Sequence, residues 1–510
     1  MHLSELVQTS IAVSSTSSRL EKTASLAALL KRLSPDDVQM AIGFLIGFPR
    51  QGKLGVGWAT VSSAREHTPA STPSLELSDV DHAFDMMQAA KGQNSSNERA
   101  RLVAELFSRA TADEQRFLSA LIVGEVRQGA LEGVLTEAIA AAAGFPADRV
   151  RRAAMMAGDL GVVAAALLGP DGESALAAYQ VELFRPVRPM LADSAETVAD
   201  ALAESREAAI EWKLDGARIQ VHRDGDRVAV YTRNLNDVTA RVPEVVDAVL
   251  ELPARDLILD GEVIALFPNG RPQSFQDTMR RFGRRLDVDM MRAELPLTPF
   301  FFDILRLGGE SLIDHALSDR LARLDDILPP ALRVPRIVTR DADEAARFQA
   351  EALDRGHEGV MVKALLAPYA AGRRGSAWLK VKKARTLDLV VLAVEWGSGR
   401  RQGWLSNIHM GARDPNTGGF VMLGKTFKGM TDEILRWQTA ELLARETHRE
   451  GHVVYVRPEL VVEIAFNEVQ RSSQYPGGVA LRFARVKGYR PDKSAAETDT
   501  IDAVRAFLPT

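Results

Sequence analysis

The chain has 510 residues, of which 46% are hydrophobic and 26% are charged. A chain of this length is expected to form several soluble domains, because single hydrophobic cores stop growing near ~250–300 residues. The chain contains no cysteine, which excludes disulfides, thiolate zinc sites and a cysteine nucleophile. Its formal net charge of −5 excludes a protein coated in positive charge, so any nucleic-acid binding must come from local basic patches.

The sequence also lacks signals for membranes and export. No uninterrupted apolar run reaches the ~18 residues that a membrane-spanning helix needs. Residues 1–6 are not a basic segment leading into a long apolar core, so no signal peptide is predicted. The nine histidines show no metal-ligand spacing. We therefore expect a cytoplasmic protein without membrane contact and without a structural zinc.

Residues 1–170 are predicted to be mostly helical. Ser34 precedes a proline and two acids, which is typical of a helix start because the serine can cap the first turn and the acids interact with the positive end of the helix dipole. Thr111 and Glu114 fit a capping box. The alanine-rich stretch 138–168 is typical of packed helices.

A strong turn at 169–172 ends the helical part, and residues 182–192 lead as an extended segment into a second domain. Short strands and turns predominate from Glu211, and the pattern changes again beyond about residue 386. Several short strands with one helix in ~110 residues suit a small closed barrel such as an OB-fold. The predicted strands lie near 387–394, 405–412, 419–425, 453–457 and 460–466, and the helix near 431–446.

The segment 211–218, Glu-Trp-Lys-Leu-Asp-Gly-Ala-Arg, organises the second domain. Side chains alternate faces along a strand, so Glu211, Lys213 and Asp215 are expected on one face, and Gly216 permits a turn that a residue with a Cβ would resist. A lysine amine can act as a covalent nucleophile if its surroundings keep it partly neutral. The alternative is a surface hairpin in which Lys213 is solvated between two acids, and the short Lys-x-Asp-Gly pattern alone favours that alternative.

Later segments together supply what phosphoryl transfer to a lysine requires. Two glutamates on predicted strands, Glu262 and Glu358, can hold a divalent metal through oxygen ligands. Lys380 and Lys382 share a face by the two-residue period of a strand and can bind phosphate oxygens. Their charge would lower the pKa of a nearby Lys213, while the acids oppose that shift. Each feature alone has an ordinary explanation, such as a turn or a solvated strand face. The segments are Tyr231–Asn234, Leu259–Val263, Phe300–Ile304, Glu358–Lys363 and Trp378–Lys383.

In order and spacing the segment 211–218 and these five later segments resemble motifs I, Ia, III, IIIa, IV and V of the covalent nucleotidyltransferases, and specifically of ATP-dependent DNA ligases. The resemblance covers residues 189–493. It extends into the helical part, where Gly-Glu-Val-Arg-Gln-Gly-Ala-Leu-Glu-Gly-Val at 124–134 and Gly-Asp-Leu-Gly-Val-Val at 158–163 resemble signatures of the ligase DNA-binding domain. The whole chain is similar to the three-domain DNA ligases of actinobacteria and archaea. Agreement of so many ordered motifs is far more specific than any single match.

The resemblance implies a role for each matched residue. Lys213 would be the nucleophile that forms the lysyl-AMP intermediate. Glu211 would lie by the adenine, and Phe302 would stack on it. Glu358 would bind the metal, and Glu262 the ribose or the metal. Arg218 and Arg233 would also contact the 5′-phosphate of a nick. The residues implied to contact the nucleotide are Glu211, Arg218, Arg233, Glu262, Phe302, Arg374, Lys380 and Lys382.

The counterpart of motif VI, residues 481–493, departs from the family. Ala484 stands where proline is usual, and Val-Lys-Gly at 486–488 replaces the usual Phe-Ile-Arg. The resemblance implies that the basic residues of this motif orient the pyrophosphate. Those that remain are Arg482, Arg485, Arg490 and Lys493.

The implied fold is multidomain. It has an all-α N-terminal DNA-binding domain (1–172), a linker (173–187), an α+β nucleotidyltransferase domain with antiparallel sheets (188–386) and a C-terminal OB-fold β-barrel (387–510). The implied activity is sealing of 5′-phosphate/3′-hydroxyl nicks in duplex DNA with ATP and Mg²⁺ or Mn²⁺, through lysyl-AMP and adenylated DNA, in replication, repair or recombination. We expect a monomer that encircles nicked double-stranded DNA and is nucleoid-associated when bound to it.

Local basic patches must bind the DNA backbone. All charged residues within 371–385 are basic, and 279–285 form a second patch that includes Arg281, for which a solvated loop is an equal alternative. Arg127 and Gln128 would add contacts from the helical domain. Each phosphate neutralised should contribute about −0.9 to the slope of log affinity against log salt. We expect readout of DNA shape rather than of sequence.

Other functions stay open at this point. An RNA ligase or a GTP-using capping enzyme would share the chemistry, but the helical domain and the segment around Arg127 argue against both. NAD as the adenylate donor is disfavoured because that class usually carries a cysteine zinc site, and this chain has no cysteine. A non-catalytic nucleic-acid-binding scaffold on a decayed ligase fold is a different class of answer, and the intact lysines and glutamates of the motifs argue against it.

Overall fold

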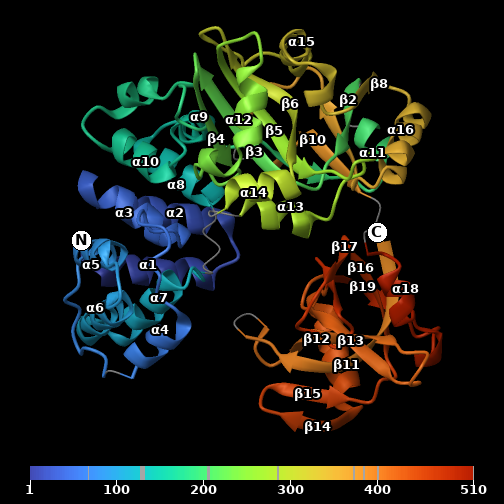
Figure 1. Ribbon diagram of the computed structural model, residues 1–510. Coiled ribbons are helices and arrows are strands. Elements are labelled where there is room, and N and C mark those ends of the chain that lie inside the picture. Colours follow the sequence, from blue (N-terminus) through green and yellow to red (C-terminus); the bar gives the residue numbers. More distant parts are fainter. Residues whose placement is uncertain are drawn as a thin grey trace.

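Three parts of the chain, each with its own hydrophobic core, follow one another in the computed structural model (Figure 1). The structure describes residues 1–66, 68–126, 132–203, 207–283, 287–370, 374–382, 385–398 and 401–508. In Figure 1 the helical part lies on the left in blue and teal, the central sheets at the top in green and yellow, and the C-terminal part at the lower right in orange and red. None of the described helices is long and apolar enough to span a membrane.

The N-terminal part is helical, as predicted. Both predicted helix starts are confirmed: the Ser34 side chain accepts a hydrogen bond from the backbone N–H of Asp37, and Thr111 and Glu114 form a capping box. The helices are α1 (Leu3–Ser15), α2 (Arg19–Leu30), α3 (Pro35–Ile46), α4 (Trp58–Ala64), α5 (Leu77–Ala89), α6 (Ser95–Arg109), α7 (Ala112–Ile122), α8 (Glu132–Ala143), α9 (Ala147–Ala157) and α10 (Leu160–Leu168), followed by the short η1 (Gly172–Ala178).

Helix α9 joins the helical part to the central sheets. Met155 and Met156 pack in one apolar cluster with Ile258 and Leu305, which belong to two neighbouring strands of the central part. The extended segment before β1 (Leu191–Ser194) contributes Val187 to the same cluster. The predicted lead-in at 182–192 is therefore packed between the two parts.

Two five-stranded sheets form the central part. The first has the order β1, β10 (Arg374–Lys382), β9 (Gly359–Ala364), β2 (Ala208–Lys213) and β8 (Arg336–Thr339). The second has the order β4 (Arg227–Thr232), β3 (Ala217–Asp224), β5 (Asp256–Ala265), β6 (Leu297–Leu307) and β7 (Glu310–Ser311). Neighbouring strands are antiparallel except for β1 and β10, which run parallel. The antiparallel sheets predicted for this part are confirmed.

Amphipathic helices cover the sheets. Buried side chains of α11 (Val198–Ala203) and α16 (Ala342–Asp354) pack on the first sheet, and those of α12 (Pro243–Leu250) and α15 (Leu317–Ile327) pack on the second. The remaining helices are α13 (Phe275–Phe282) and α14 (Val288–Glu294). Because β2 and β3 belong to different sheets, the turn between them carries the chain from one layer to the other.

The C-terminal part is rich in sheet. Its long strand β11 (Arg385–Trp396) pairs with β12 (Leu405–Arg413) on one edge and with β15 (Val453–Val456) and β16 (Val461–Phe466) on the other. The predicted strands and the helix α17 (Asp432–Leu443) are confirmed. The sheet also includes β13 (Phe420–Thr426), β14 (Glu446–Glu450) and β19 (Arg485–Tyr489), and β17 (Glu468–Arg471) pairs with β18 (Val479–Arg482).

Candidate active site

Lys213 is the last residue of β2, at the point where the chain leaves one sheet for the other. The neighbouring strand fixes its backbone, because the N–H of Glu358 donates to the carbonyl oxygen of Lys213 at 3.1 Å. Glu211, Lys213 and Asp215 all line one pocket between the two sheets. Trp212 and Leu214 line it too, and β2 ends at Lys213, so the shared face of these three residues stays a prediction.

Close packing explains the two glycines at this position. A Cβ on Gly216 would lie 2.2 Å from the carbonyl oxygen of Val263 in β5. A Cβ on Gly359, whose φ is +140°, would lie 2.2 Å from the carbonyl oxygen of Val381 in β10. Gly216 was expected to provide conformational freedom for a turn, but the structure shows that it provides room for a close approach. Both contacts hold the end of β2 against the strands that carry the other charged residues.

Acidic and basic side chains meet around the lysine in a cluster that we call the charged end, formed by Lys213, Asp215, Glu262, Glu358 and Lys382. The first three line the pocket, and Glu358 and Lys382 line the cleft beside it. The Lys213 ammonium lies 2.5 Å from a carboxylate oxygen of Glu358, and the Lys382 ammonium lies 2.7 Å from the same oxygen. The exposed fraction of the side chain is 20% for Lys213, 13% for Glu358 and 29% for Lys382. A single carboxylate thus bridges two lysines at the edge of solvent.

The influences on the Lys213 pKa oppose one another. Burial lowers the pKa of this ammonium, but the carboxylates of Glu358 and Glu262 raise it by more, so it lies above the usual lysine range. The pKa of Lys382 is lowered, because burial and the charge of Lys213 outweigh the effect of Glu358. Of the two opposing effects expected from the sequence, the acids therefore prevail at Lys213. Its amine becomes nucleophilic only when the proton is removed, and the contact with Glu358 opposes that loss.

Glu262 is the least compensated acid of the charged end. Burial raises its pKa to about 7, against the opposing effects of Lys213 and Arg218. One of its carboxylate oxygens accepts a hydrogen bond from the backbone N–H of Gly216 at 3.1 Å. Glu262 therefore ties the turn after Lys213 to β5 and exchanges a proton close to neutral pH.

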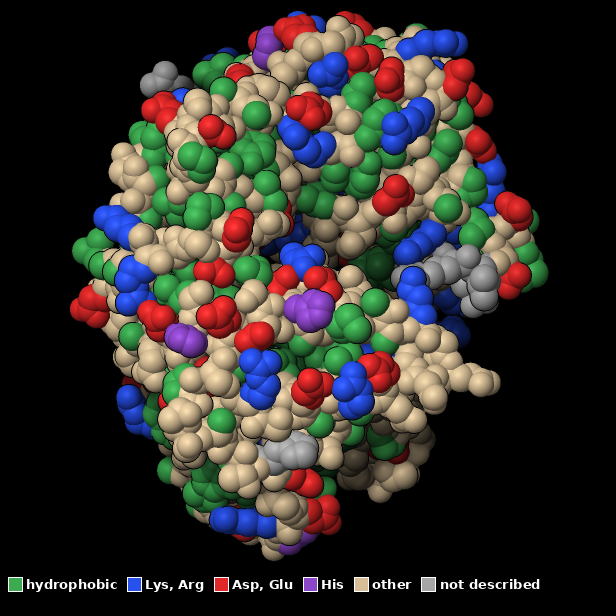
Figure 2. Space-filling view, turned by 90° about the vertical axis from the view of Figure 1, so that its left-hand side faces the viewer, with side chains coloured by type: hydrophobic (Ala, Val, Ile, Leu, Met, Phe, Trp, Pro, Cys, Tyr) green, Lys and Arg blue, Asp and Glu red, His purple; other side chains and the backbone are tan. Residues whose placement is uncertain are grey.

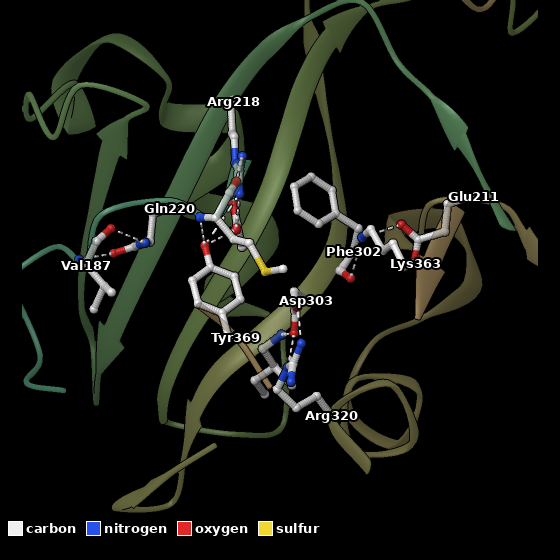
Figure 3. A network of polar contacts seen from close by, with 12 residues as sticks. Val187, Glu211, Arg218, Gln220, Phe302, Asp303, Arg320, Lys363 and Tyr369 are labelled. Carbon is white, nitrogen blue, oxygen red and sulfur yellow. Dashed lines mark hydrogen bonds and ion pairs between the residues drawn. The ribbon is translucent and has the colours of Figure 1, made fainter. Parts of the chain in front are cut away.

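The opposite side of the pocket, which we call the base end, consists of Glu211, Lys363, Phe302 and Trp378. Lys363 and Glu211 form an ion pair of 2.5 Å in which each side chain is only 2% exposed. The Lys363 ammonium also lies 4.3 Å from the centre of the Phe302 ring and 4.2 Å from that of Trp378. Figure 3 shows the Phe302 ring beside this pair. The base end is therefore an aromatic wall of two rings packed edge to face, backed by a buried ion pair.

Arg218 lies behind the aromatic wall, on the side away from Lys363 (Figure 3). Its guanidinium forms hydrogen bonds of 3.0 and 2.7 Å with the two carboxylate oxygens of Asp260 and donates to the carbonyl of Met190 at 2.6 Å. The Tyr369 hydroxyl donates to Asp260 at 2.7 Å. The side chain predicted to contact the nucleotide is thus held in a network with the segment that enters the central part.

The pocket between the two ends has a volume of about 620 Å³, which suits a nucleotide. An adjoining cleft of about 750 Å³ is lined by Glu358 and Lys382 and shares Asp215 with the pocket. The structure therefore brings most of the predicted site residues together. Those that line the pocket are Glu211, Lys213, Arg218, Arg233, Glu262, Phe302 and Lys380.

Arg482 is the residue of motif VI that reaches the pocket. Its guanidinium lies 2.8 Å from Asp215 and 3.3 Å from Glu468, and 3.5 Å from the centre of the Phe275 ring. Among the other three, Arg490 and Lys493 pair with Asp388 of β11, and Arg485 is exposed on β19. None of these three lines the pocket.

The prediction that Arg281 contacts DNA is wrong. Its side chain is fully buried, and its guanidinium donates two hydrogen bonds of 2.9 Å to Glu244 and one of 2.7 Å to the carbonyl of Arg241. Thr278, Arg281 and Phe282 form the buried face of α13, so Arg281 binds groups inside the domain and is not exposed to DNA. Arg127, Gln128 and the side chain of Arg374 lie outside the described residues.

Some residues of the site had no role assigned from the sequence. Lys363 and Trp378 lie within two of the matched segments, and they are directly opposite each other on β9 and β10. The two-residue period of β9 would have placed Met361 and Lys363 on the face of the pocket. Tyr369 follows β9 in a segment without strand periodicity, and no local pattern would have shown that it bonds to Asp260.

The described residues contain no cluster of three or more His, Asp or Glu side chains arranged to hold a metal ion. Mg²⁺ usually keeps several waters and binds through one or two carboxylates together with substrate phosphates. Glu262 and Glu358 beside Lys213 match that smaller donor set. The charged end therefore fits a metal that arrives with a triphosphate.

Sequence models of known families match most of the chain. The model described as DNA ligase N terminus matches residues 59–140, ATP dependent DNA ligase domain matches 189–382, and ATP dependent DNA ligase C terminal region matches 401–493.

Known relatives agree with these matches. A protein of Anaeromyxobacter sp. (strain Fw109-5) named "Probable DNA ligase" is 57% identical, over 99% of this chain and 98% of the relative. A second protein of that name, from Anaeromyxobacter dehalogenans (strain 2CP-1 / ATCC BAA-258), is 56% identical over 99% of both chains. The solved structure named Pmar-Lig_Pre. is 18% identical and superposes with a TM-score of 0.62, over 95% of this chain and 99% of the other. This last similarity concerns the fold alone.

Proposed function

This chain belongs to the ATP-dependent DNA ligase family, and from that premise we propose that Lys213 accepts adenylate from ATP and passes it to the 5′-phosphate of a DNA nick. The chain is an enzyme that joins DNA by forming phosphodiester bonds. The observation that carries the proposed mechanism is the position of Lys213 at one end of a nucleotide-sized pocket, where Glu358 joins it to Lys382 of the adjoining cleft, with Phe302 and Trp378 at the other end.

The proposed reaction has three displacements at phosphorus. The Lys213 amine attacks the α-phosphate of ATP, a lysyl–AMP bond forms and pyrophosphate leaves. The nick 5′-phosphate then takes the AMP and frees the lysine. Finally the 3′-hydroxyl attacks that phosphate, the phosphodiester bond forms and AMP leaves. Negative charge builds on phosphate oxygens in each step, so cations and donors aimed at those oxygens contribute most.

Glu358 has two successive tasks in this proposal. In the protein without nucleotide it holds the Lys213 ammonium at 2.5 Å. A triphosphate entering the charged end would compete with Glu358 for Lys382 and Lys213. Mg²⁺ or Mn²⁺ bound by Glu262 and Glu358 would supply charge neutralisation of the phosphate oxygens. Loss of the contact with Glu358 would then favour loss of the Lys213 proton.

We assign the remaining contacts from the pocket and the family resemblance. Phe302 would stack on the adenine, and Glu211 would lie at its edge. Arg233 is exposed at the pocket rim, where it would meet the 5′-phosphate of the nick. Lys380 and Lys382 would bind phosphate oxygens. Arg218 would act mainly by fixing the back of the aromatic wall, because Asp260 already occupies its guanidinium.

The C-terminal part would act as a moving OB-fold domain. Support comes from the strand β11, which pairs along both edges, and from the contact of Arg482 with Asp215 across the two parts. We expect this domain to close on ATP for the first step and to turn away for the later ones, which would bring Arg485, Arg490 and Lys493 nearer the pyrophosphate at closure. Finding the domain in one position in both ATP-bound and nick-bound structures would refute this.

The DNA would be held by several parts of a monomer that encircle the duplex. The proposed parts are a helical domain at 1–172, a linker at 173–187, a nucleotidyltransferase domain at 188–386 and the C-terminal domain at 387–510; the three separate cores support this division. Basic and acidic side chains are interspersed on the face shown in Figure 2, which is hollowed at mid-height. We expect local basic residues such as Arg127, together with Gln128, to contact the DNA backbone. The sealing reaction would serve replication, repair or recombination.

The proposed function is tested by sealing of a singly nicked duplex with a fluorescent 5′ strand, in the presence of Mg²⁺ and ATP, GTP or NAD. Of the three nucleotides, we expect only ATP to give the longer labelled strand that sealing produces. A parallel incubation with α-labelled nucleotide should attach label to the protein in a Lys213-dependent way. A non-catalytic scaffold would take up no label, and a capping-type enzyme would take it from GTP.

A further inference from the structure

Lys363 is a buried lysine that the proposed transfer chemistry does not use. Its ammonium pairs with one oxygen of Glu211 at 2.5 Å, donates to the carbonyl of Phe302 at 3.4 Å, and lies near the centres of the Phe302 and Trp378 rings. An ammonium removed from water needs such compensation, and aromatic faces attract cations. Figure 3 shows Lys363 between Glu211 and Phe302. Its surroundings are therefore built for a charged lysine.

The other oxygen of Glu211 is left for a ligand. This Oε1 is buried and accepts no hydrogen bond. The Arg336 guanidinium lies 4.0 Å from it, beyond hydrogen-bonding distance, and is engaged at 2.5 Å by Asp325. Glu211 and Phe302 both line the pocket. Buried polar atoms are nearly always paired, so a donor on the bound molecule is expected to complete this one.

We propose that Lys363 is a positioning residue that sets the choice of purine, by holding Glu211 as an ionised acceptor whose free oxygen faces the base. An ionised carboxylate accepts hydrogen bonds and donates none. It therefore selects a purine with an amine at C6, as in adenine, and repels one with a carbonyl there, as in guanine. This inference rests on the proposed uptake of a nucleotide by Lys213.

Loss of the ammonium would change what Glu211 can do. Burial raises the pKa of the Glu211 carboxyl, and Lys363 opposes that rise. Without Lys363 the carboxyl takes up a proton more readily, and a protonated carboxyl both donates and accepts. It can then bond to an amine or to a carbonyl, so the preference for adenine weakens even though Glu211 is still present.

The first experiment uses the unmodified chain. The protein is incubated with Mg²⁺ and ATP, purine riboside triphosphate (which lacks the C6 amine) or GTP, and nucleotide attached to Lys213 is followed by intact-mass spectrometry. We expect kcat/KM for the analogue to be about 10- to 100-fold below that for ATP, the range of a hydrogen bond to a charged group, and GTP to react more slowly still. Equal rates with ATP and the analogue would overturn the inference. Absence of any product with ATP would instead overturn the proposed function.

The second experiment separates positioning from general stability. Lys363→Met and Glu211→Gln should each lower the ATP-to-GTP ratio of kcat/KM about 10-fold or more, and the double variant should lower it no further, because Lys363 acts through Glu211. Arg320→Lys is the matched control: it alters another fully buried cation, paired with Asp303 at 2.7 Å behind the pocket, and should leave the ratio unchanged. A wild-type ratio in Lys363→Met would overturn the inference. Should that variant fail to fold, the analogue comparison decides.

Discussion

The two ends of the pocket use the same chemical groups in different ways. At the base end Lys363 and Glu211 are each 2% exposed and lie against two aromatic rings, so their pairing is part of the folded core. At the charged end the Glu358 carboxylate forms ion pairs with both Lys213 and Lys382, and all three side chains are partly exposed to solvent. In the proposed reaction, the charges that recognise the base, Lys363 and Glu211, would thus be fixed in the core. The charges that take part in the transfer, Lys213, Glu358 and Lys382, would be able to exchange partners.

The strongest test of the charged end is Lys213→Ala. Removing the nucleophile should lower covalent nucleotide uptake and nick sealing roughly 10³-fold or more, because no other group can form the intermediate. Sealing is measured on a gel and uptake by mass. The melting temperature should stay close to that of the wild type, since Glu358 retains Lys382 as its partner. Residual uptake at the wild-type rate would place the nucleophile elsewhere.

The two lysines Lys363 and Lys382 allow a direct comparison of the ends. Lys363→Met should cost about 3 kcal/mol of unfolding free energy, because it leaves the buried Glu211 without its counter-charge. Lys382→Met should cost less than about 1 kcal/mol, because its side chain is partly exposed and Glu358 keeps Lys213. Urea unfolding of both variants measures the difference. Equal losses would contradict the distinction between fixed and exchangeable charges.

Replacing the acid that holds the nucleophile should affect activity more than stability. Glu358→Gln is expected to slow adenylation about 10²-fold, because a carboxylate that holds Lys213 and would bind the metal is lost. Single-turnover uptake of labelled ATP measures the rate. Asp314→Asn is a suitable control, because Asp314 pairs with Arg152 on the exposed surface away from the pocket. A larger effect on melting temperature than on rate would assign Glu358 to the fold.

The contact between Arg482 and Asp215 should have a moderate effect. Arg482→Ala is expected to slow adenylation about 10-fold, because the C-terminal part loses its ion pair with Asp215 of the charged end and closes less well. Arg449→Ala is the control from the same part of the chain, since Arg449 pairs with Glu446 within β14. The rate of sealing of an already adenylated nick should change less than the rate of adenylation. Equal slowing of both would argue against a role in closure.

Glu262 should give the smallest effect, seen as a pH dependence of stability. Its pKa is raised in the folded chain from 4.5 to about 7, so the stability it allows is fully present below pH 4.5 and is lost as the pH rises through about 7. Glu262→Gln cannot titrate and avoids that loss. Its unfolding free energy relative to the wild type should therefore rise by about 1 kcal/mol from pH 5 to pH 8, a value reduced for the partial exposure of the side chain. Thermal unfolding across this range measures it. A constant difference would rule out titration of Glu262.

Much of this organisation could be predicted from the sequence, because it is encoded locally. The helix cap at Ser34 predicts the start of α3, and the strand-borne motifs contain most of the predicted residues that line the pocket. What could not be predicted depends on partners far along the chain. Arg281 belongs to a basic run, yet Glu244 holds it in the core. The strand β14 has no apolar alternation, since its residues are mostly exposed, and only its pairing with β15 defines it.

The hydrogen bond from the N–H of Glu358 to the carbonyl of Lys213 has a wider consequence. It ties the last residue of β2 to the residue just before β9, next to the final pair of that ladder, so the backbones of the proposed nucleophile and its acid are held together whatever the length of the chain between the two strands. Insertions or deletions between the strands can therefore accumulate over evolution, and substrate range can diversify with them, without disturbing the distance on which bond formation depends.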